Sequence, residues 1–466
     1  MSIHRGIWTG LSLAIAFALA PYAPAAASTQ TVLHTMCTSA GCTDGARPAT
    51  QLLKSGSVLY GVAQGGSHAS ASHSAGVVYK YDTSTSTYTV LYNFCVSISF
   101  SSCTDGENPT GPLIADTSGN LYGTTSLGGN RNNAGTVYEL VKPVSGTTWT
   151  YKNIYKFCPT KIGSVECEDG DEPLSGLTYY GAASGTAYDG SSALYGTTYA
   201  GGDDDIGSYG NGILFSVQPS GASWAYNVVH EFCFGCAELC TTNCGDGEKP
   251  IGPLAMDASN RIWGTTYVGG SAGKGTAFLI TTAGAETILY NFCWVGATKC
   301  LDGQWPLGAL LDASGDMFVA TSTGGSGPDT TGNGALVELT NTGCTEYGPT
   351  VYWCSAVKHN FCSVTACADG WGPDGTLIMD GSGNIFGTTG LGGSATYVAN
   401  GGGTIWKQAG ATESVLYDFC ASSSTCPDGY DPGDGVTMDS SGTLYGTAPF
   451  GGSSTAPNGV VYKFVP

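Results

Sequence analysis

Charged residues are scarce in this chain of 466 residues, at 11% of the total, whereas roughly 25% is usual for soluble domains. Lys and Arg together number 16 against 36 Asp and Glu, and the formal net charge is −20. A chain so poor in basic residues lacks the electrostatic footprint of a nucleic-acid-binding protein, so we exclude that partner. The acidity is expected to serve solubility or a cationic partner.

The chain also lacks apolar stripes of helical period and, beyond its first residues, long apolar runs. The first absence argues against a helical fold, and the second excludes a membrane span in the rest of the chain. Gly, in contrast, supplies 72 positions, and Tyr, Thr, Val and Ser fill much of the remainder. This mixture favours short strands joined by tight turns, so the composition predicts an all-β protein.

The first 27 residues have the three parts of a secretory signal peptide. Arg5 stands in a short basic region, an apolar stretch runs over 11–20, and three alanines at 25–27 form a small-residue cleavage site. The pattern predicts that residues 1–27 are removed and that 28–466 form a single mature domain. An uncleaved anchor is the alternative, although the apolar stretch is short for one. We therefore expect a secreted, periplasmic or extracellular protein with no membrane span after cleavage.

One unit of sequence recurs along the rest of the chain. It begins with an apolar segment that ends in Cys ("VLYNFC", 90–95), followed by a second Cys and Asp-Gly-x-x-Pro. It then reads "GPLIADTSGNLYGTT", a Gly-Gly pair, a variable loop and "GTVYEL". The Asp-Gly pair marks seven units, at Asp44, Asp105, Asp169, Asp246, Asp302, Asp369 and Asp428. Each unit offers four strand-like segments between turn signals, which is the content of one propeller blade.

The phase of the repeat predicts a closed ring. We expect the "GPLIAD" segments to form the innermost strand of each blade and the "VLYNFC" segments the outermost. The mature chain opens on an outermost segment (31–37) and ends on a third segment (459–465), so pairing them completes blade seven and covers two strand edges. The prediction is a seven-bladed β-propeller with four strands per blade, closed by the N-terminal strand. An open β-solenoid is the alternative, but it should carry polar caps.

The pattern "DGENPTGPLIADTSGNLYGTTSLGGN", followed by "GTVYEL" and "NFC", resembles the GloVer tandem repeat of bacterial exported proteins, also described as choice-of-anchor proteins. The resemblance covers essentially all of 31–466. It implies an extracellular or surface location and a propeller-like β fold. It supplies no catalytic residue that could be transferred to this chain.

The 18 cysteines form an even number and recur at one place in the repeat. In an exported protein this pattern predicts nine disulfides, most of which bracket the loop after an outermost strand. The predicted pairs are Cys37/Cys42, Cys95/Cys103, Cys158/Cys167, Cys233/Cys244, Cys236/Cys240, Cys293/Cys300, Cys344/Cys354, Cys362/Cys367 and Cys420/Cys426. The nesting of the four cysteines within 233–244 stays open, and zinc binding is their alternative.

Residues typical of catalysis form no recognised motif. Phosphate-binding and His-Glu-x-x-His patterns are missing, and no Gly-x-Ser-x-Gly segment has the strand-to-helix context of a nucleophile elbow. His34, His230 and His359 stand where other units have the Tyr of "LYNFC", so we interpret them as substitutes in a structural position. His68 and His73 share the first variable loop and give only a weak metal signal.

Acidic residues offer two further cation candidates. The seven Asp-Gly carboxylates are predicted to cap local turns before each Pro, with a ring of carboxylates around a cation as the alternative. The acidic run 203–205 is a better candidate, although a solvated loop also explains it. No cofactor is predicted, and calcium is the ion that these acidic loops leave open.

The loops that enter the innermost strands and the variable loops after Gly-Gly should emerge on one face, here called the disulfide face. Nearly all variation between units falls there, which predicts that this is the binding face. Its candidate ligand-binding residues are Trp294, Trp305, Trp371 and Tyr397. Exposed rings stack on sugars or grip a protein partner, and packing between blades is the alternative interpretation.

The sequence therefore predicts a monomeric binding or surface-interaction module for a neutral polysaccharide or a surface protein. The competing class is an extracellular enzyme on the same scaffold, such as a cation-dependent lyase, a lactonase or a glycan hydrolase. An enzyme should bring several acidic or His side chains together at the mouth of the central channel.

Overall fold

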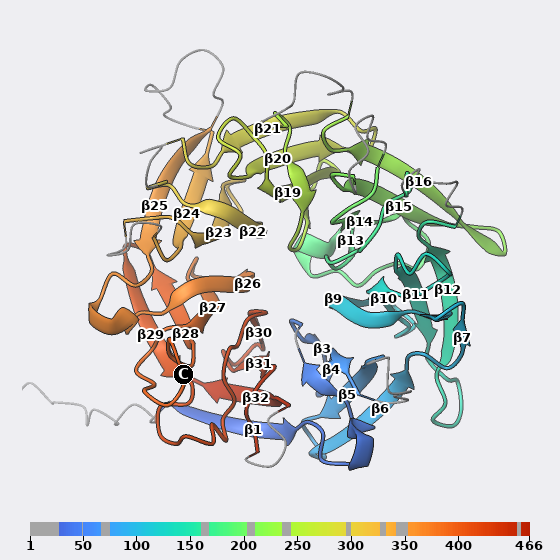
Figure 1. The fold of residues 1–466 in the computed structure, drawn as a ribbon, viewed down its shortest axis with the longest axis horizontal. Helices are drawn as coiled ribbons and strands as arrows, with labels where there is room; N and C mark the ends of the chain where they lie inside the picture. Colours follow the sequence, from blue (N-terminus) through green and yellow to red (C-terminus); the bar gives the residue numbers. More distant parts are fainter. Residues whose placement is uncertain are drawn as a thin grey trace, which may run out of the picture.

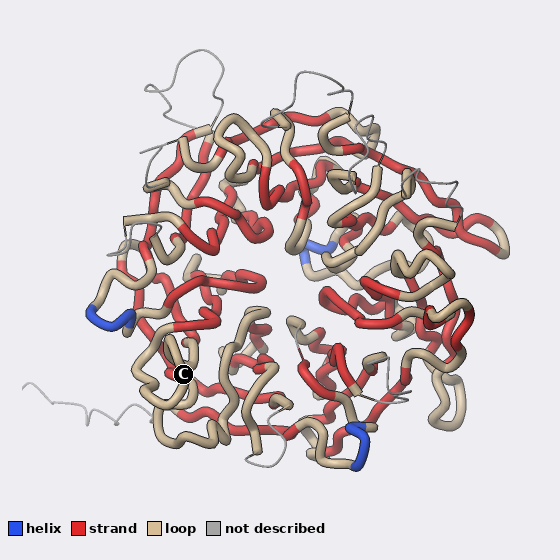
Figure 2. Tube along the Cα trace, in the orientation of Figure 1, coloured by secondary structure: helices blue, strands red, loops and turns tan. Residues whose placement is uncertain are grey.

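The computed structural model describes residues 28–48, 50–66, 75–159, 167–202, 210–234, 244–294, 300–326, 332–341, 353–453 and 458–466. These residues form seven antiparallel sheets arranged as blades around a central axis (Figure 1). Strands and loops make up the described chain apart from three short 3-10 turns (Figure 2). These turns are Ala40–Cys42, Ala182–Ser184 and Thr365–Cys367. The prediction of an all-β, seven-bladed propeller is confirmed.

Each blade runs in chain order from an innermost strand to an outermost one. Blade one contains β2 (Ala46–Pro48) with β3 (Leu53–Ser55), then β4 (Val58–Gly65), β5 (Val77–Asp82) and β6 (Thr87–Asn93). Blade two contains β9 (Glu107–Ala115), β10 (Leu121–Leu127), β11 (Thr136–Val141) and β12 (Thr150–Lys156). Blade three contains β13 (Thr178–Tyr179), β14 (Leu194–Thr198), β15 (Ile213–Ser220) and β16 (Ser223–Glu231).

The remaining blades repeat this order. Blade four contains β17 (Glu248–Pro250) with β18 (Ala255–Met256), then β19 (Arg261–Val268), β20 (Thr276–Thr281) and β21 (Glu286–Asn291). Blade five contains β22 (Gln304–Leu311), β23 (Met317–Thr323), β24 (Ala335–Thr340) and β25 (Cys354–Asn360). Blade six contains β26 (Trp371–Met379), β27 (Ile385–Leu391), β28 (Thr404–Ala409) and β29 (Thr412–Asp418). A small hairpin, β7 (Ile98–Ser99) with β8 (Ser102–Cys103), lies in the loop between blades one and two.

Blade seven is completed by the start of the chain. It contains β30 (Val436–Met438), β31 (Leu444–Ala448) and β32 (Val460–Val465), and its outermost strand is β1 (Thr29–Thr35). β1 pairs antiparallel with β32 from Thr29 opposite Val465 to Thr35 opposite Val460. Figure 1 shows the first strand lying against the last one at the rim. The predicted closure of the ring is therefore confirmed.

A glycine in the second strand makes room for an aromatic ring of the third strand. Gly123 in β10 lies opposite Tyr138 in β11, and a Cβ atom at Gly123 would lie only 2.6 Å from the Tyr138 hydroxyl oxygen. Blade five has Val319 at this position, and there the opposite residue is Val337. The exchange of a glycine–aromatic pair for two buried valines keeps the core filled. The recurrent Gly of the repeat is thus a packing requirement.

Among pairs whose two cysteines are both described, seven of the predicted disulfides are present. They join Cys37 to Cys42, Cys95 to Cys103, Cys158 to Cys167, Cys233 to Cys244, Cys293 to Cys300, Cys362 to Cys367 and Cys420 to Cys426. Each closes the loop that leaves an outermost strand, as the spacing predicts. Cys236, Cys240 and Cys344 lie outside the described residues. Among the residues that are described, no helix is long and apolar enough to cross a membrane.

Candidate functional site

A cavity of about 270 Å³ lies among the innermost strands and the loops that lead into them. All seven blades contribute to its wall, including Gln51, Thr110, Ser175, Ile251, Leu307, Thr376 and Asp434. Asp434 is the ionisable residue among the described lining residues. The described wall is otherwise made of neutral polar and apolar groups. It does not bring together the set of acidic and His side chains that the enzyme hypothesis requires.

At the disulfide-face end of the innermost strands, one backbone geometry repeats seven times. The second residue after each Asp-Gly pair has a positive φ, between 55° and 62°. These seven positions, here called the mouth ring, are Arg47, Asn108, Glu172, Lys249, Trp305, Gly372 and Asp431. Each of their N–H groups donates to a carbonyl of the preceding blade, for example Trp305 to Lys274 at 2.9 Å and Arg47 to Asn458 at 2.8 Å.

The mouth ring has a constant backbone and a different side chain in every blade. A positive φ in a residue other than Gly costs about 1 kcal/mol or more and persists only where the surroundings enforce it. Here the enforcing contact is the inter-blade hydrogen bond. A rigid scaffold that presents varied side chains is typical of a recognition surface. The ring was not predicted from the sequence, where its signal is that the residue directly before each Pro of the repeat differs between units.

Aromatic and basic residues gather on one part of this ring. Trp305 stacks on Tyr267 at the end of β19, with ring centroids 5.7 Å apart and planes inclined by 24°. The Lys274 ammonium lies 5.3 Å from the Trp305 ring centroid. One blade earlier, Lys249 lies 5.2 Å from the ring centroid of Tyr199. These five half-buried residues, here called the aromatic sector, come from blades three to five.

The four predicted ligand-binding residues occupy different surroundings. Trp294 is 48% exposed after β21, and Tyr397 is 53% exposed between β27 and β28. Trp305 and Trp371 are half-buried and lie within β22 and β26, whereas the sequence suggested loops. Among the ring contacts of the described residues, none joins two of these four. The structure instead brings Trp305 together with Tyr267, which the sequence did not single out.

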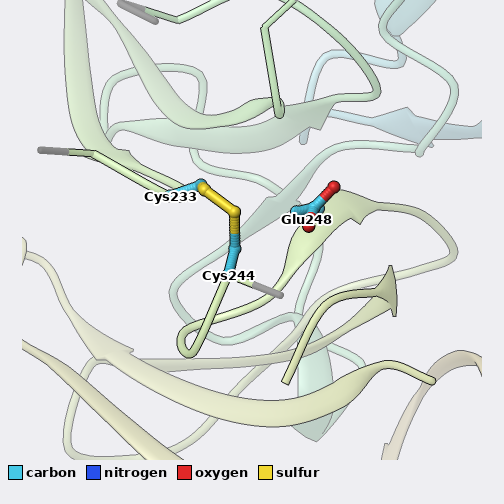
Figure 3. A group of neighbouring side chains, drawn as sticks. All are labelled: Cys233, Cys244 and Glu248. Atoms are coloured by element: carbon cyan, nitrogen blue, oxygen red, sulfur yellow. A yellow bond between two sulfur atoms is a disulfide. The ribbon is translucent and has the colours of Figure 1, made fainter. Parts of the chain in front are cut away.

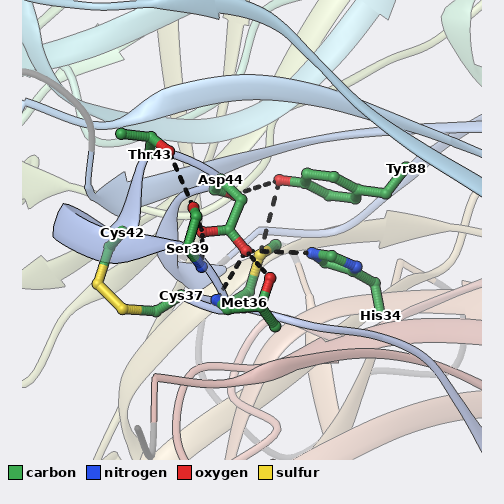
Figure 4. Close-up of polar contacts among 9 residues, drawn as sticks. His34, Met36, Cys37, Ser39, Cys42, Thr43, Asp44 and Tyr88 are labelled. Carbon is green, nitrogen blue, oxygen red and sulfur yellow. Dashed lines mark hydrogen bonds and ion pairs between the residues drawn. A yellow bond between two sulfur atoms is a disulfide. The ribbon is translucent and has the colours of Figure 1, made fainter.

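The seven Asp-Gly carboxylates are engaged in local hydrogen bonds. Asp302 accepts from the Tyr290 hydroxyl at 2.6 Å and from the Trp294 N–H at 3.0 Å. Asp44 accepts from Ser39 at 2.7 Å, and His34 approaches it at 3.6 Å (Figure 4). The prediction of a local capping role is right, but the predicted position before the Pro is wrong. Each carboxylate folds back onto the start of its own Cys-to-Cys loop.

The three histidines occupy the position that Tyr fills in other blades, as predicted. Their Nε2 atoms lie 3.6 Å, 3.7 Å and 3.4 Å from the carboxylates of Asp44, Asp246 and Asp369, respectively. Burial lowers the pKa of His34 below its ordinary value. Burial also opposes the charged form of His230, but Asp246 and Glu286 outweigh this effect and raise its pKa. Burial raises the pKa of Glu286 itself to about 8.

The alternative that the cysteines of unit four bind zinc is wrong for Cys233 and Cys244. Cys233 and Cys244 are joined by a disulfide beside Glu248, so their sulfur atoms are not thiolates (Figure 3). The predictions for Cys236, Cys240, His68, His73 and 203–205 fall outside the described residues.

Another cavity, of about 930 Å³, lies on the other face, between blades four and five. Trp263 and Trp353 meet edge to face in its wall at 5.5 Å, and Arg261 pairs with Asp257 at 2.7 Å. Two lining residues border the range 342–352, which lies outside the described part of the chain. We therefore place the candidate site at the aromatic sector.

Several solved structures are similar to this chain. A luciferin-regenerating enzyme is 13% identical, with 94% of this chain and 95% of that chain covered and a TM-score of 0.39. An ulvan lyase of polysaccharide lyase family PL25 is 12% identical, with coverages of 87% and 88% and a TM-score of 0.46. The polysaccharide lyase Uly1 is 10% identical, with 90% of each chain covered and a TM-score of 0.46. No curated protein matches the chain in sequence.

A family comparison gives a direct match to the repeat. The Gloeobacter/Verrucomicrobia repeat matches residues 19–192, which include the first two blades and the start of the third. The same unit continues to the end of the chain. The match confirms, over residues 19–192, the resemblance seen in the sequence.

Proposed function

We propose that the protein is a binding module that holds a neutral polysaccharide on the aromatic sector of its disulfide face. The observation that carries the proposal is the stack of Trp305 on Tyr267, capped by Lys274 and fixed by the inter-blade hydrogen bond of the mouth ring. Rings that are already held in place lose little conformational freedom when a ligand binds.

The chemistry of the sector suits a sugar chain. Aromatic rings stack on the C–H faces of sugars, and each ring contributes on the order of 1 kcal/mol beyond its buried area. The ammonium groups of Lys249 and Lys274 can donate hydrogen bonds to hydroxyls. Glu172 and Asp431 stand in the same mouth ring, and the chain carries a net charge of −20. This excess of negative charge disfavours a polyanion, so we propose a neutral polymer.

The other predicted rings extend the proposed surface. Trp294 precedes blade five, and Tyr397 lies in the variable loop of blade six. Both are about half exposed, at 48% and 53%. Trp371 opens β26 between them in the chain. Contacts spread over neighbouring blades would favour a polymer over a single sugar, because weak contacts then act together.

The test is binding to a panel of neutral and uronate-bearing glycans, with Trp305→Ala and Tyr267→Ala beside the wild type. We expect binding to a neutral glycan and a loss of about 5–10-fold in affinity in each variant. The matched control is Tyr430→Ala, which removes another stacked pair, Tyr430 with Phe450 at 5.3 Å, in blade seven. Binding by this control should equal that of the wild type.

Three outcomes would contradict the proposal. One is a wild-type protein that binds no neutral glycan. Another is a loss of stability in Trp305→Ala that matches its loss of binding, because the ring would then serve packing. The third is the release of new sugar ends from the glycan, which would assign the protein to the enzyme class.

A further inference from the structure

The outermost strands of neighbouring blades meet at the rim of the ring in a repeated way. The Tyr or His near the end of one outermost strand faces a residue near the start of the next one. Tyr155 of β12 stacks on Tyr226 of β16 with centroids 3.8 Å apart. His34 of β1 stacks on Tyr88 of β6 at 3.7 Å, beside Asp44 (Figure 4). At these junctions the two facing residues are aromatic, and the contact is a ring stack.

The junction between blades three and four departs from this pattern. There His230 of β16 faces Glu286 of β21, and the Asp-Gly carboxylate of Asp246 joins them. The His230 Nε2 atom lies 3.5 Å from Glu286 Oε2 and 3.7 Å from Asp246 Oδ2. All three atoms lie within 4.8 Å of one another. Two carboxylates and an imidazole therefore converge at a place where the two junctions described above have stacked rings.

The separations suit ligands of a tetrahedral metal ion. Zinc binds His nitrogen and carboxylate oxygen at about 2.0–2.2 Å, which places neighbouring ligand atoms about 3.4 Å apart. The two distances from His230 Nε2 are close to this value, and both exceed a normal hydrogen bond. Small rotations of the carboxylates would complete the coordination.

The polar atoms at this junction retain free coordinating capacity. His230 Nε2 and Glu286 Oε1 are buried and have no hydrogen-bond partner. A backbone hydrogen bond to Gly284 also favours the charged form of His230. A metal-ligating His usually has its other ring nitrogen bound to a carbonyl or a carboxylate, which fixes the orientation of the ring.

We infer that His230, Asp246 and Glu286 form a binding site for a divalent transition metal of the zinc class, which links the rims of blades three and four. The imidazole nitrogen favours such a metal over calcium, which takes oxygen ligands. A divalent cation also balances the two carboxylates that the fold holds together in a partly buried place. The fourth position is left to water or a further ligand.

A second junction provides an internal control. His359 and Asp369 lie 3.4 Å apart, and Glu413 of β29 stands where Glu286 does in blade four. Among the described residues, however, the potential ligand atoms of this trio do not all lie within 4.8 Å of one another, as those of His230, Asp246 and Glu286 do. The same residue types in looser geometry should bind a metal more weakly.

The experiment titrates the full protein, with disulfides intact, with Zn²⁺ and Ca²⁺ by calorimetry and with Co²⁺ by visible absorption. We expect Zn²⁺ to bind more tightly than Ca²⁺, and Co²⁺ to give the strong visible band of tetrahedral coordination. Glu286→Gln should weaken Zn²⁺ binding about 100-fold or more, since loss of even an outer partner costs 10–100-fold. The Glu413→Gln control should bind as the wild type does.

A double variant, His230→Tyr with Glu286→Tyr, rebuilds the ring stack of Tyr155 with Tyr226. The double variant should keep the fold and lose the high-affinity site. It therefore tests the inference even if Glu286→Gln misfolds. Equal Zn²⁺ affinity in the wild type and the double variant would overturn the inference. So would the absence of Zn²⁺ binding in the wild type, or tighter binding of Ca²⁺ than of Zn²⁺.

Discussion

At the scale of single residues, several of the few charged side chains of this protein form hydrogen bonds that hold its loops in place. Asp169, Asp302 and Asp428 each accept from a Tyr hydroxyl of the neighbouring outermost strand. A hydrogen bond to a charged group contributes about 1.5–3 kcal/mol, roughly twice a neutral one. The repeated carboxylate therefore ties these Cys-to-Cys loops to the outermost strands from which they leave.

Glu413 is a residue whose ionised form is destabilised by the fold. Burial raises its pKa to about 7 from an ordinary value of 4.5, His359 opposes this shift, and Asp369 adds to it. The folded state thus holds the proton more tightly than the unfolded state. The free energy of unfolding should fall as pH rises from about 4.5 to about 7, and it should stay lower above that range.

Glu413→Gln removes this dependence, because Gln has no proton to lose. The free energy of unfolding of the variant, measured relative to that of the wild type at the same pH, should be about 1 kcal/mol higher at pH 8 than at pH 4. The value is modest because solvent screens a partly exposed group. Urea unfolding at the two pH values measures the difference. Asp189→Asn should show the opposite sign in a lower pH range, since the backbone N–H groups of Ser192 and Ser191 lower the pKa of Asp189 below its ordinary value of 3.8 and its contribution to stability is lost only as pH falls below that value. The prediction would be wrong if the free energies of unfolding of Glu413→Gln and the wild type differed by the same amount at both pH values.

At the scale of strands, sequence patterns predicted the order of the blade but not its inner ends. Alternating apolar residues and turn signals locate β10, β11 and β12 because each strand pairs with its neighbour in the chain. The innermost strand begins earlier than predicted, at Glu107 in blade two, because Asp-Gly-x-x-Pro has the composition of a turn. The stack of Trp305 on Tyr267 joins two blades, so its geometry depends on packing that no local pattern encodes.

The first strand closes the ring, and its removal should be costly. Deleting residues 28–35 exposes the edge of β32 and removes Val32, which packs against the core cluster that contains Phe464. Loss of two apolar side chains, Val32 and Leu33, should lower the free energy of unfolding by about 3 kcal/mol or more. The open edge should also promote association between molecules.

Thermal melting and light scattering measure both effects. The control is a chain that begins at Ser28 and therefore keeps β1. If the shortened protein melts at the control temperature and stays monomeric, blade seven does not depend on β1, and the closure has no energetic role.

At the scale of the whole molecule, two features stabilise the fold. One is the packing of similar sheets in a ring, and the other is the set of disulfides that close short loops. The seven described disulfides span separations of only 5 to 11 residues. None of them links the two faces of the propeller. They fix the loops of the disulfide face, which are the segments that vary most between units and that present exposed side chains such as Phe100, at 82%, and Phe234, at 64%.

Reduction of these bonds should therefore destabilise the entire ring. Closing a loop of this length contributes about 2–3 kcal/mol, and seven such loops together match or exceed the 5–15 kcal/mol that is usual for a folded protein. We expect the protein, once reduced and alkylated, to lose its cooperative melting transition in circular dichroism. Replacing one pair, Cys420 and Cys426, by serine should lower the free energy of unfolding by only about 2–3 kcal/mol and leave a single transition. A reduced protein that melts within a few degrees of the oxidised one would mean that inter-blade packing alone maintains the fold, and that the disulfides serve only to order the loops.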